Sequence, residues 1–437
     1  MTGRKRDRRM GTSRMSETLP AWAFFVFPAL MVACGGDGAS GRGTPVPLGD
    51  PLRVSVEAQD STGTIRILPD PAGEPIPELR FEEEYRLGAE GSEELFQNEY
   101  MILTFRPDGS LLVNSHYGDR LLLFDSAGGF VRQLAGPGRG PGELDNPTAL
   151  GIAPDGSIWV ANAFDRRYTK FDSAGAFVRT AERPFGALVQ RQKRLVFRED
   201  GVTFIDQSAD LRGRLASVDF TVMDTLGTIV RSYPQLHLQP WHSRDLGLIP
   251  GRFDLGRAPD YYTFTVFGFD EDEVWFGVSD KLRIFRRTWA GDTTMVISGE
   301  HRAAELSAED RSILQTSIRR AGYDWDDFYF SRPLLHALYP LPNGGVLVQL
   351  TEGLRRENTP FFEIYSESGE LVGTVEFPLP ISVQSIPGFQ DDRIAVVATD
   401  ELDVPYILVG RLKGVQGDGE AYTYDFGRRA HEESGVP

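Results

Sequence analysis

The chain contains one stretch of sequence twice, with the two copies 47 residues apart. The first copy, Pro107 to Arg132, and the second, Pro154 to Arg179, are identical at 14 of 26 aligned positions. Both begin with Pro-Asp-Gly-Ser, and both contain Phe-Asp-Ser-Ala-Gly shortly before a final Phe-Val-Arg. A repeat of this length corresponds to one four-stranded blade of a β-propeller. The repeat therefore constrains the fold strongly and says little about chemistry.

The second copy contains the four strands that such a blade requires. Apolar segments at 148–153, 157–162, 167–172 and 176–182 are separated by turns rich in Pro, Asp, Gly and Ser. Aromatic and β-branched residues bounded by such turns predict strands joined as hairpins. Similar but less regular units continue to residue 412. We therefore predict an all-β fold, a six-bladed β-propeller of four-stranded antiparallel blades.

The sixth unit contains three clear strands, at 383–386, 393–398 and 406–412. An unpaired blade edge invites aggregation, so we expect the ring to be closed by a strand from elsewhere. The best candidate is the segment Leu79 to Leu87, which lies upstream of the first unit. We predict that it pairs into the sixth blade, with Glu82, Glu83 and Glu84 forming a solvated edge.

The N-terminus has the pattern of a secretory signal peptide. Six basic residues precede the apolar run Ala21 to Ala33, and Cys34 follows directly. A charged start, a short apolar core and a small residue before the cleavage point define such a signal. The run of 13 residues is shorter than the roughly 20 residues that a membrane-spanning helix needs.

Cys34 is the single cysteine of the chain, and its neighbourhood predicts lipidation. The sequence Leu30-Met31-Val32-Ala33-Cys34 resembles the lipobox of bacterial lipoproteins, in which the cysteine is acylated and becomes the new N-terminus. The alternative is a buried free cysteine after an ordinary signal peptide. The next residues, 35–50, are small, polar and rich in Gly and Pro, which is typical of a flexible tether.

The first two units also carry a family resemblance. The stretch from Gly136 to Pro147, GPGRGPGELDNP, together with the following Pro-Asp-Gly strand and FDSAG turn, resembles an NHL repeat. The sequence around it resembles bacterial six-bladed propeller lipoproteins of the NHL-repeat and TolB-like superfamily, over residues 60–412. This resemblance implies a propeller located in the cell envelope, and it implies no single activity.

The connections between the predicted strands are unequal in length. In a blade, the turn from the first to the second strand and the turn from the third to the fourth share one face. These turns are uniformly short here. The other face receives every long connection, at 136–147, 207–217, 234–261, 299–334 and 350–360. Loops on a rigid scaffold commonly carry binding residues, so we predict a binding surface on this face.

The candidate binding residues are aromatic and histidine side chains on this face. They are His116, Tyr117, Phe164, Trp241, His242, Tyr323 and Trp325. Aromatic residues interspersed with carboxylates suit a sugar or peptide surface, and packing of the loops themselves is the alternative. The connection 299–334 also predicts one short helix, with Ser307 as the N-cap and Gly322 after the last turn.

No residue pattern for catalysis, metal binding or a cofactor is present in the sequence. His237 and His242 are five residues apart with Pro240 between them, so helical zinc-ligand spacing is excluded. The glycine-rich segment 136–142 lacks the Lys-Ser/Thr ending of a phosphate-binding loop. No Gly-x-Ser-x-Gly nucleophile motif occurs. A metal site assembled from several blades remains open as an alternative.

Several charged residues recur at equivalent repeat positions. Arg120 and Arg167 are predicted to be structural braces that donate hydrogen bonds to backbone carbonyl groups. The aspartates of the repeated turns, such as Asp108 and Asp155, are predicted to stabilise those turns.

Charge argues against one class of partner. The formal net charge of the chain is −17, and residues 1–33 carry +4, so the remainder carries −21. A body this acidic repels phosphate backbones, which excludes nucleic acid as a partner. Two classes of function remain: a non-enzymatic binding or scaffolding lipoprotein for a protein, peptide or glycan, and a metal-dependent propeller enzyme such as a lactonase or lyase.

The predicted organisation has four parts. Residues 1–33 form the lipoprotein signal peptide, and 34–59 form the lipid anchor and flexible tether. The propeller occupies 60–415, and 416–437 form a C-terminal tail. This order predicts a protein anchored to a membrane of the bacterial cell envelope, facing the periplasm or the exterior.

Overall fold

The structure of the protein is a computed structural model. The residues it describes are 77–88, 96, 98–116, 118–163, 165–183, 193–198, 203–210, 217–232, 265–278, 281–302, 307–308, 311–312, 315–316, 319, 334–350, 361–382, 385–415 and 419–427. The chain divides into two compact units, Met1–Asp50 and Pro51–Pro437, and every described residue belongs to the second. The predicted signal peptide, Cys34 and the tether up to residue 59 therefore lie outside the described residues.

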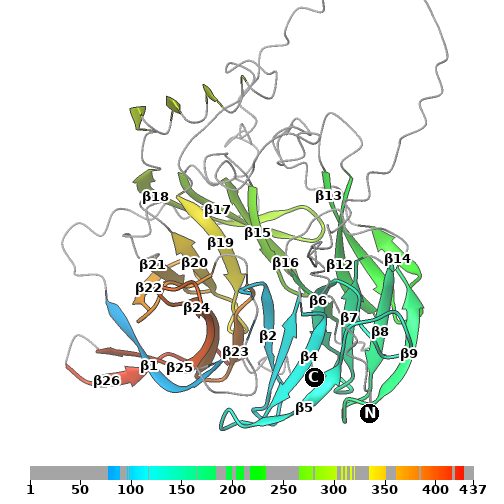
Figure 1. Ribbon diagram of the computed structural model, residues 1–437. Coiled ribbons are helices and arrows are strands. Elements are labelled where there is room, and N and C mark those ends of the chain that lie inside the picture. The colour runs from blue at the N-terminus through cyan, green and yellow to red at the C-terminus, as the bar shows by residue number, and fades with distance from the viewer. Residues whose placement is uncertain are drawn as a thin grey trace, which may run out of the picture. The chain divides into compact units, whose positions relative to one another are not determined.

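Most of the described strands form modules of four antiparallel strands (Figure 1). Module 1 consists of β2 (Met101–Phe105), β3 (Leu111–Ser115), β4 (Arg120–Phe124) and β5 (Phe130–Ala135). Module 2 consists of β6 (Pro147–Ile152), β7 (Ile158–Asn162), β8 (Arg167–Phe171) and β9 (Phe177–Glu182). Module 3 consists of β11 (Val196–Phe197), β12 (Thr203–Asp210), β13 (Ser217–Asp224) and β14 (Ile229–Ser232).

Three further modules follow along the chain. Module 4 consists of β15 (Thr265–Phe269), β16 (Glu273–Val278), β17 (Lys281–Thr288) and β18 (Thr293–Arg302). Module 5 consists of β19 (Leu335–Pro340), β20 (Val346–Leu350), β21 (Phe361–Tyr365) and β22 (Leu371–Glu376). Module 6 consists of β23 (Gly388–Gln390), β24 (Arg393–Thr399), β25 (Pro405–Val415) and β1 (Glu78–Leu87). Two short strands are added at sheet edges, β10 (Lys193–Arg194) beside β6 and β26 (Ala421–Thr423) beside β25.

Strand β1 joins the beginning of the described chain to its end. It pairs antiparallel with β25, from Arg80 opposite Lys413 to Leu87 opposite Ile407. Its first residues also pair in parallel with β22, so modules 5 and 6 form one nine-stranded sheet. The predicted pairing of Leu79 to Leu87 with the last strands is confirmed by this register.

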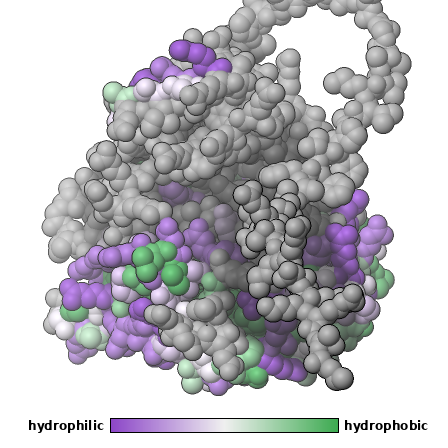
Figure 2. Space-filling view, viewed as in Figure 1, coloured by the Kyte–Doolittle hydropathy of each residue, from purple (hydrophilic) through white to green (hydrophobic). Residues whose placement is uncertain are grey.

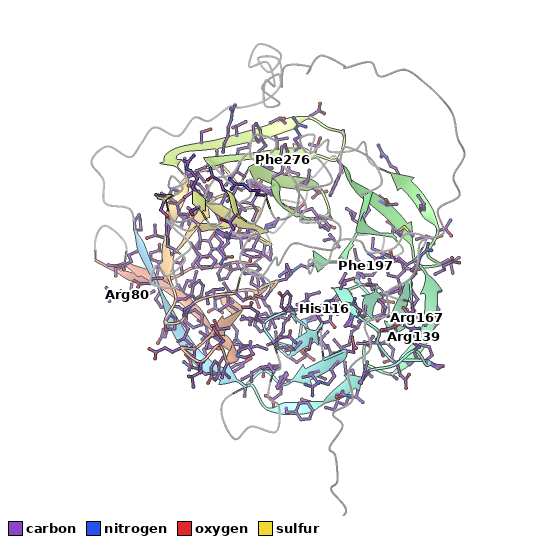
Figure 3. All side chains as sticks on the ribbon, turned by 45° about the horizontal axis from the view of Figure 1, so that its top comes forward. Arg80, His116, Arg139, Arg167, Phe197 and Phe276 are labelled. Atoms are coloured by element: carbon purple, nitrogen blue, oxygen red, sulfur yellow. The ribbon has the colours of Figure 1, made fainter. Side chains whose placement is uncertain are left out.

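Burial follows the position of a strand within its module. Every residue of the second strands β3, β7 and β20 is buried. The fourth strand β5 is exposed at four of its six positions. A strand that is covered on both faces needs apolar side chains at consecutive positions, whereas an outer strand does not. The sheets therefore pack face to face, and Figure 3 shows them arranged around a common centre.

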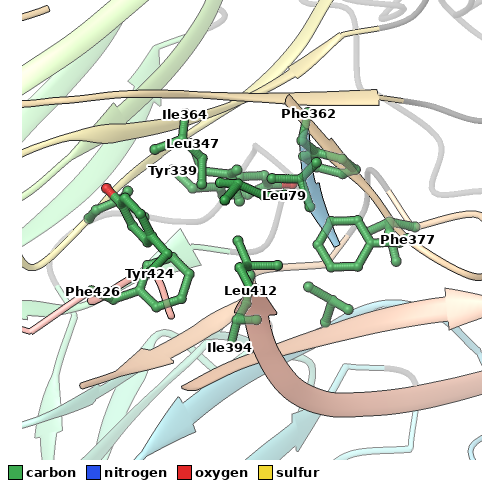
Figure 4. Close-up of a cluster of buried hydrophobic side chains, with 14 of the residues drawn as sticks. Leu79, Tyr339, Leu347, Phe362, Ile364, Phe377, Ile394, Leu412, Tyr424 and Phe426 are labelled. Atoms are coloured by element: carbon green, nitrogen blue, oxygen red, sulfur yellow. The ribbon is translucent and has the colours of Figure 1, made fainter. Parts of the chain in front are cut away.

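The hydrophobic core is divided into clusters, each of which joins two modules. Each pair of consecutive modules from 1 to 6 shares one such cluster, and a further cluster lies between modules 6 and 1. In the cluster between modules 2 and 3, Trp159 packs against Phe204 with ring centroids 5.8 Å apart. Figure 4 shows the cluster between modules 5 and 6, in which Leu79 of β1 packs among Phe362 and Leu412.

Close approach of the first strands depends on glycine at two positions. A Cβ atom on Gly151 of β6 would lie 2.3 Å from the carbonyl oxygen of Leu195. A Cβ atom on Gly268 of β15 would lie 2.4 Å from the carbonyl oxygen of Leu338. Both distances are far below van der Waals contact, so these positions exclude any side chain. The first strands of neighbouring modules are therefore brought together by backbone contact.

Arginine side chains link the modules near their short turns. Arg132 donates to the carbonyl of Ala174, and Arg179, at the equivalent repeat position, donates to the carbonyl of Thr225. Arg286 of module 4 donates to the carbonyl of Glu367 in module 5, at 3.0 Å. The final arginine of each sequence repeat thus binds a turn of the following module.

Three details differ from the sequence-based expectation. The predicted connection 207–217 is shorter than expected, because β12 and β13 extend through eight paired positions and 211–216 alone connect them. The predicted strand 383–386 is replaced by β23, and Ile386 forms an isolated bridge with Ile102. The segment expected to be a tail contributes β26 and the fully buried Phe426, whose ring lies 5.2 Å from that of Phe389.

A short helical stretch occurs where one was predicted. The described residues 308, 311, 312, 315, 316 and 319 are helical. The amide of Arg311 donates to the carbonyl of Ser307 at 3.0 Å, which is the hydrogen bond of a first helical turn. Among the described residues no helix is long and apolar enough to cross a bilayer.

The described surface is mainly polar, with small separate apolar areas (Figure 2). The exposed large apolar side chains include three pairs on the outer strands of modules 1 to 3. They are Phe130 and Val131 of β5, Phe177 and Val178 of β9, and Ile229 and Val230 of β14. The exposed fraction of Phe130 is limited to 42%, because its ring also packs edge-on against Phe124, 5.7 Å away.

Candidate functional site

The connections at the two ends of the modules differ in kind. Turns between the first and second strands, and between the third and fourth, are closed by short-range hydrogen bonds. The Asp125 carboxylate accepts the amides of Ala127 at 2.9 Å and Gly129 at 2.8 Å, and the Asp155 carboxylate accepts the amide of Ser157 at 2.9 Å. The predicted role of these aspartates as turn residues is confirmed. This end of each module is compact and saturated with internal bonds.

The opposite end carries the long connections. From the strand bounds, these are 183–192, 233–264, 303–334 and 351–360, together with the described connection 136–146. Six predicted candidates lie outside the described residues. They are Tyr117, Phe164, Trp241, His242, Tyr323 and Trp325.

The connection 136–146 between β5 and β6 is held rigidly by its own hydrogen bonds. The amide of Gly138 donates to the carbonyl of Leu144 at 2.8 Å, and the amide of Leu144 donates to the carbonyl of Gly136 at 2.9 Å. The Glu143 carboxylate accepts the amide of Gly140 at 2.6 Å. This glycine-rich segment is therefore an ordered connection between two modules, as the sequence predicted.

Arg167 braces the same connection from module 2. Its guanidinium donates to the carbonyl groups of Arg139 at 2.6 Å, Glu143 at 3.0 Å and Gly140 at 3.3 Å. An ion pair with Asp165 at 2.6 Å fixes the guanidinium in place. The predicted bracing role of Arg167 is confirmed. Its repeat equivalent Arg120 makes no such bond with any described residue, because the connection that precedes module 1 has a different sequence.

A chain of alternating charges runs along the surface of this connection. Arg139, whose side chain is 73% exposed, pairs with Asp145 at 2.6 Å. Arg167 pairs with Asp165, and both of these side chains are largely buried. Figure 3 shows Arg139 and Arg167 lying together, with His116 nearer to the centre. The exposed end of this chain is a cationic group held on a rigid loop.

His116 supports the connection from module 1. It is 3% exposed, and its ring Nδ1 lies 3.1 Å from the carbonyl oxygen of Pro147. Burial lowers the pKa of His116, so the ring is neutral at pH 7 and Nδ1 carries the proton that it donates. Tyr100 packs beside it, with ring centroids 6.3 Å apart. His116 therefore fixes the position of Pro147 and does not project from the predicted binding face.

Two carboxylates nearby have raised pKa values. Burial raises the pKa of Asp119, although its carboxylate accepts the amide of Asn146 at 2.8 Å. Burial also raises the pKa of Asp165, against the lowering effect of Arg167. Asp119 and its repeat equivalent Arg166 both have positive φ, at 48° and 52°. An arginine in this left-handed region is unusual, so the turn is held by its surroundings.

Among the described residues, no group of three or more His, Cys, Asp or Glu side chains is placed to hold a metal ion. Each charge in the cluster faces an opposite charge or a backbone group, as a structural network does. What the arrangement offers is a rigid polar platform beside the long connections.

Sequence reasoning missed several side chains that hold the modules together. Glu84 was expected on a solvated edge, and its carboxylate instead pairs with Arg393 at 3.0 Å and with Arg411. Arg194 of β10 donates to the carbonyl of Pro387, which precedes β23. These contacts join residues far apart in sequence, and no local pattern signals them.

No protein-family model matches the sequence, and no match is found among curated proteins. Many solved structures show distant similarity, and three of them serve as examples. A Bacteroides fragilis protein that is described as exported is 14% identical, with 77% of this chain and 96% of that chain covered and a TM-score of 0.45. Virginiamycin B lyase from Staphylococcus aureus is 13% identical, with 79% and 88% covered and a TM-score of 0.37. A gluconolactonase from Xanthomonas campestris is 12% identical, with 72% and 87% covered and a TM-score of 0.38.

Similarity at this level assigns neither a family nor an activity to the chain. The fold assignment rests on the strand topology. The described residues define an all-β protein of repeated four-stranded antiparallel modules, an arrangement consistent with a β-propeller.

Proposed function

We propose that this chain is a closed six-bladed β-propeller, anchored in the bacterial cell envelope through a lipid on Cys34. It acts there as a non-enzymatic binding or scaffolding protein for a protein, peptide or glycan partner. Six hydrophobic clusters between consecutive modules, the last of them between module 6 and module 1, support the ring. The pairing of β1 with β25 supports closure by the N-terminal strand.

The observation that carries the binding function is the difference between the two ends of the modules. One end has short turns saturated with internal hydrogen bonds, such as those of Asp125 and Asp155. The other end receives the connections 233–264, 303–334 and 351–360, all much longer than a turn requires. Long loops on a rigid scaffold are where recognition residues are commonly found. The braced connection 136–146 supplies a fixed charged edge beside them.

The proposal assigns the partner surface to loop aromatics, of which Trp241 and Trp325 are the first to test. A photo-crosslinking amino acid at position 241 or 325 of the full-length protein, expressed in its native cells, should trap one discrete partner. The same amino acid at position 130, on the outer strand β5, is the matched control. It replaces an aromatic residue that is 42% exposed and distant in sequence from the connections 233–264, 303–334 and 351–360.

A crosslinking pattern at 241 and 325 that equals the pattern at 130 would contradict the partner surface. A metal-dependent enzymatic activity would replace the proposed binding function altogether. Stoichiometric calcium or zinc in the purified protein, with chelator-sensitive turnover of a lactone or ester, would establish the metal-dependent propeller enzyme that the sequence left as the alternative.

The anchor is tested separately. A Cys34→Ser variant should lose incorporation of labelled fatty acid and move from the membrane fraction to the soluble fraction. The apolar run ahead of Cys34 has 13 residues, which is shorter than a membrane-spanning helix, and cleavage of the signal peptide removes it. The mature chain would therefore depend on the lipid for membrane attachment. Unchanged membrane association of the variant would refute lipid anchoring.

A further inference from the structure

An arginine on the short strand beside module 2 reaches module 6. Arg194 belongs to β10, which lies parallel to β6, with Arg194 in register with Leu150. Its guanidinium donates to the carbonyl of Pro387, directly before the first strand of module 6. Its carbon Cζ lies 5.4 Å from the ring centroid of Phe389. The side chain therefore links the strand beside β6 of module 2 to the segment directly before the first strand of module 6.

The segment 385–387 that receives Arg194 is contacted from other modules as well. The amide of Ile386 donates to the carbonyl of Met101, and the amide of Leu103 donates back to Ile386, both at 2.9 Å. The hydroxyl of Tyr339 in β19 lies 3.5 Å from the carbonyl oxygen of Ser385. Module 1, Tyr339 of module 5 and Arg194 beside module 2 thus meet one short segment ahead of β23. Arg194 lies where the inner strands converge.

The charge of Arg194 has no counter-ion among the residues that the structure describes. Its Nε atom is buried and has no hydrogen-bond partner there. Burial lowers the pKa of Arg194 to about 10, so the guanidinium remains charged at pH 7. A charge withdrawn from water is costly unless an opposite charge or a full set of hydrogen bonds compensates it.

Three other partly buried arginines of this protein have an ion-pair partner. Arg167 pairs with Asp165 at 2.6 Å, Arg286 with Glu273 at 2.8 Å, and Arg393 with Glu84 at 3.0 Å. The chain carries 63 acidic residues and a net charge of −17, so carboxylates are abundant. Among the described residues Arg194 faces no carboxylate, which is the property of a site that receives its anion from outside.

We propose that Arg194 is the anchor of a binding site for a small anion that carries a carboxylate or phosphate group. The planar guanidinium presents several N–H donors in a fork that matches either group. Arg194 as a residue is partly exposed, although its Nε atom is buried. Phe389 and Tyr339 provide aromatic surface next to the charge, which suits an anion with an apolar body. This site is separate from the proposed partner surface on the long connections.

The test measures saturable binding of two probes, succinate and inorganic phosphate, to the full-length protein in detergent by isothermal titration calorimetry. Sodium chloride at matched ionic strength controls for screening. The wild type should bind one probe saturably, and the stronger of the two identifies the class of anion. Arg194→Met, which keeps the length of the side chain without the charge, should weaken binding by about tenfold or more through loss of a charge-assisted hydrogen bond.

Two controls keep the result specific to Arg194. Arg139→Met removes an exposed arginine that is already paired with Asp145, and it should leave probe binding unchanged. Arg194→Lys retains the charge without the fork and should bind with intermediate affinity. Equal binding by the wild type and Arg194→Met overturns the proposal. Absence of saturable binding of both probes to the wild type overturns it as well, whether or not the Met variant folds.

Discussion

Arg393 and Glu84 form an ion pair of 3.0 Å that ties β24 to β1, the first strand of the described chain. The same guanidinium lies between two rings, 5.5 Å from the centroid of Tyr85 and 5.4 Å from that of Phe105. It also donates to the carbonyl of Ser126 in module 1 at 3.0 Å. One side chain thus connects the N-terminal strand, module 6 and module 1.

Replacing Arg393 is therefore expected to destabilise the whole fold. Arg393→Met removes the ion pair and the hydrogen bonds and leaves Glu84 partly buried, so we expect a loss of about 2–3 kcal/mol in the free energy of unfolding. Urea unfolding measures this loss. Arg80→Met is the matched control, because Arg80 pairs with Glu78 at 3.6 Å with an 81% exposed side chain. Equal stability of the two variants would contradict the proposed role of Arg393.

Removal of β1 should unmask two sheet edges. Deletion of residues 1–50 takes away no described strand and should leave a folded, monodisperse protein. Deletion of residues 1–90 removes β1 and exposes the edges of β22 and β25, which favours edge-to-edge aggregation. Size-exclusion chromatography with light scattering distinguishes the two outcomes. Identical behaviour of both truncations would show that β1 is not required for closure.

Asp270 should make stability depend on pH. Burial raises the pKa of Asp270 to about 6, although its carboxylate accepts the amides of Asp272 and Glu273. Because the folded state binds the proton more tightly than the unfolded state, stability falls as pH rises from about 4 to about 6. Asp270→Asn keeps an accepting oxygen without the charge. We expect it to be more stable than the wild type at pH 7 by about 1–2 kcal/mol, and equally stable at pH 4.

Asp400 provides a control of opposite sign for this pH dependence. Its carboxylate accepts the amides of Leu402 and Val404, both at 2.9 Å, in a turn of the same kind. These hydrogen bonds lower the pKa of Asp400, so its charged form stabilises the fold and this contribution is lost as pH falls. Asp400→Asn should therefore be less stable than the wild type at pH 7. Thermal unfolding of both variants and the wild type at pH 4 and pH 7 measures these changes in stability. If Asp270→Asn and Asp400→Asn both gained or both lost stability relative to the wild type at pH 7, the account would be refuted.

Loss of the Arg167 brace should loosen the connection 136–146. Arg167→Met removes three hydrogen bonds to carbonyl groups and leaves Asp165 without its ion pair. We expect amide hydrogen exchange within 136–146 to accelerate by about tenfold, because local opening no longer breaks these bonds. Arg120→Met, at the equivalent repeat position, should not accelerate it. Mass spectrometry of peptic peptides measures the difference, and equal exchange in both variants would argue against the brace.

Much of the fold could be predicted from the sequence because its determinants are local. The turns of Asp125 and Asp155 close on amides two to four residues away, so the same short motif gives the same turn in each copy. Alternating turns and apolar segments then fix the strands between them. The pairing of Leu79 to Leu87 was predictable for another reason, since a missing fourth strand in the last module had to come from elsewhere.

The candidate site was predicted less well. His116 was expected on a surface, and burial against Tyr100 and Pro147 gives it a structural role. Whether a histidine at a strand end points outward depends on the neighbouring module, which the local sequence does not contain. The same reason explains why Arg120 and Arg167 differ in their hydrogen bonds although they share a repeat position. The connection before module 2 presents backbone carbonyl groups to Arg167, and the connection before module 1 has a different sequence.

The sequence by itself determined the strand order, the short turns, the bracing arginine of module 2 and the strand that joins the two ends of the chain. These features depend on residues that are close in sequence or on a repeat that can be counted. The tertiary structure alone decided that Glu84 meets Arg393 and that Arg194 reaches Pro387, across 193 positions. Such contacts arise when modules far apart in sequence are packed around one centre. Only the packed molecule therefore reveals an arginine that faces no carboxylate among the described residues.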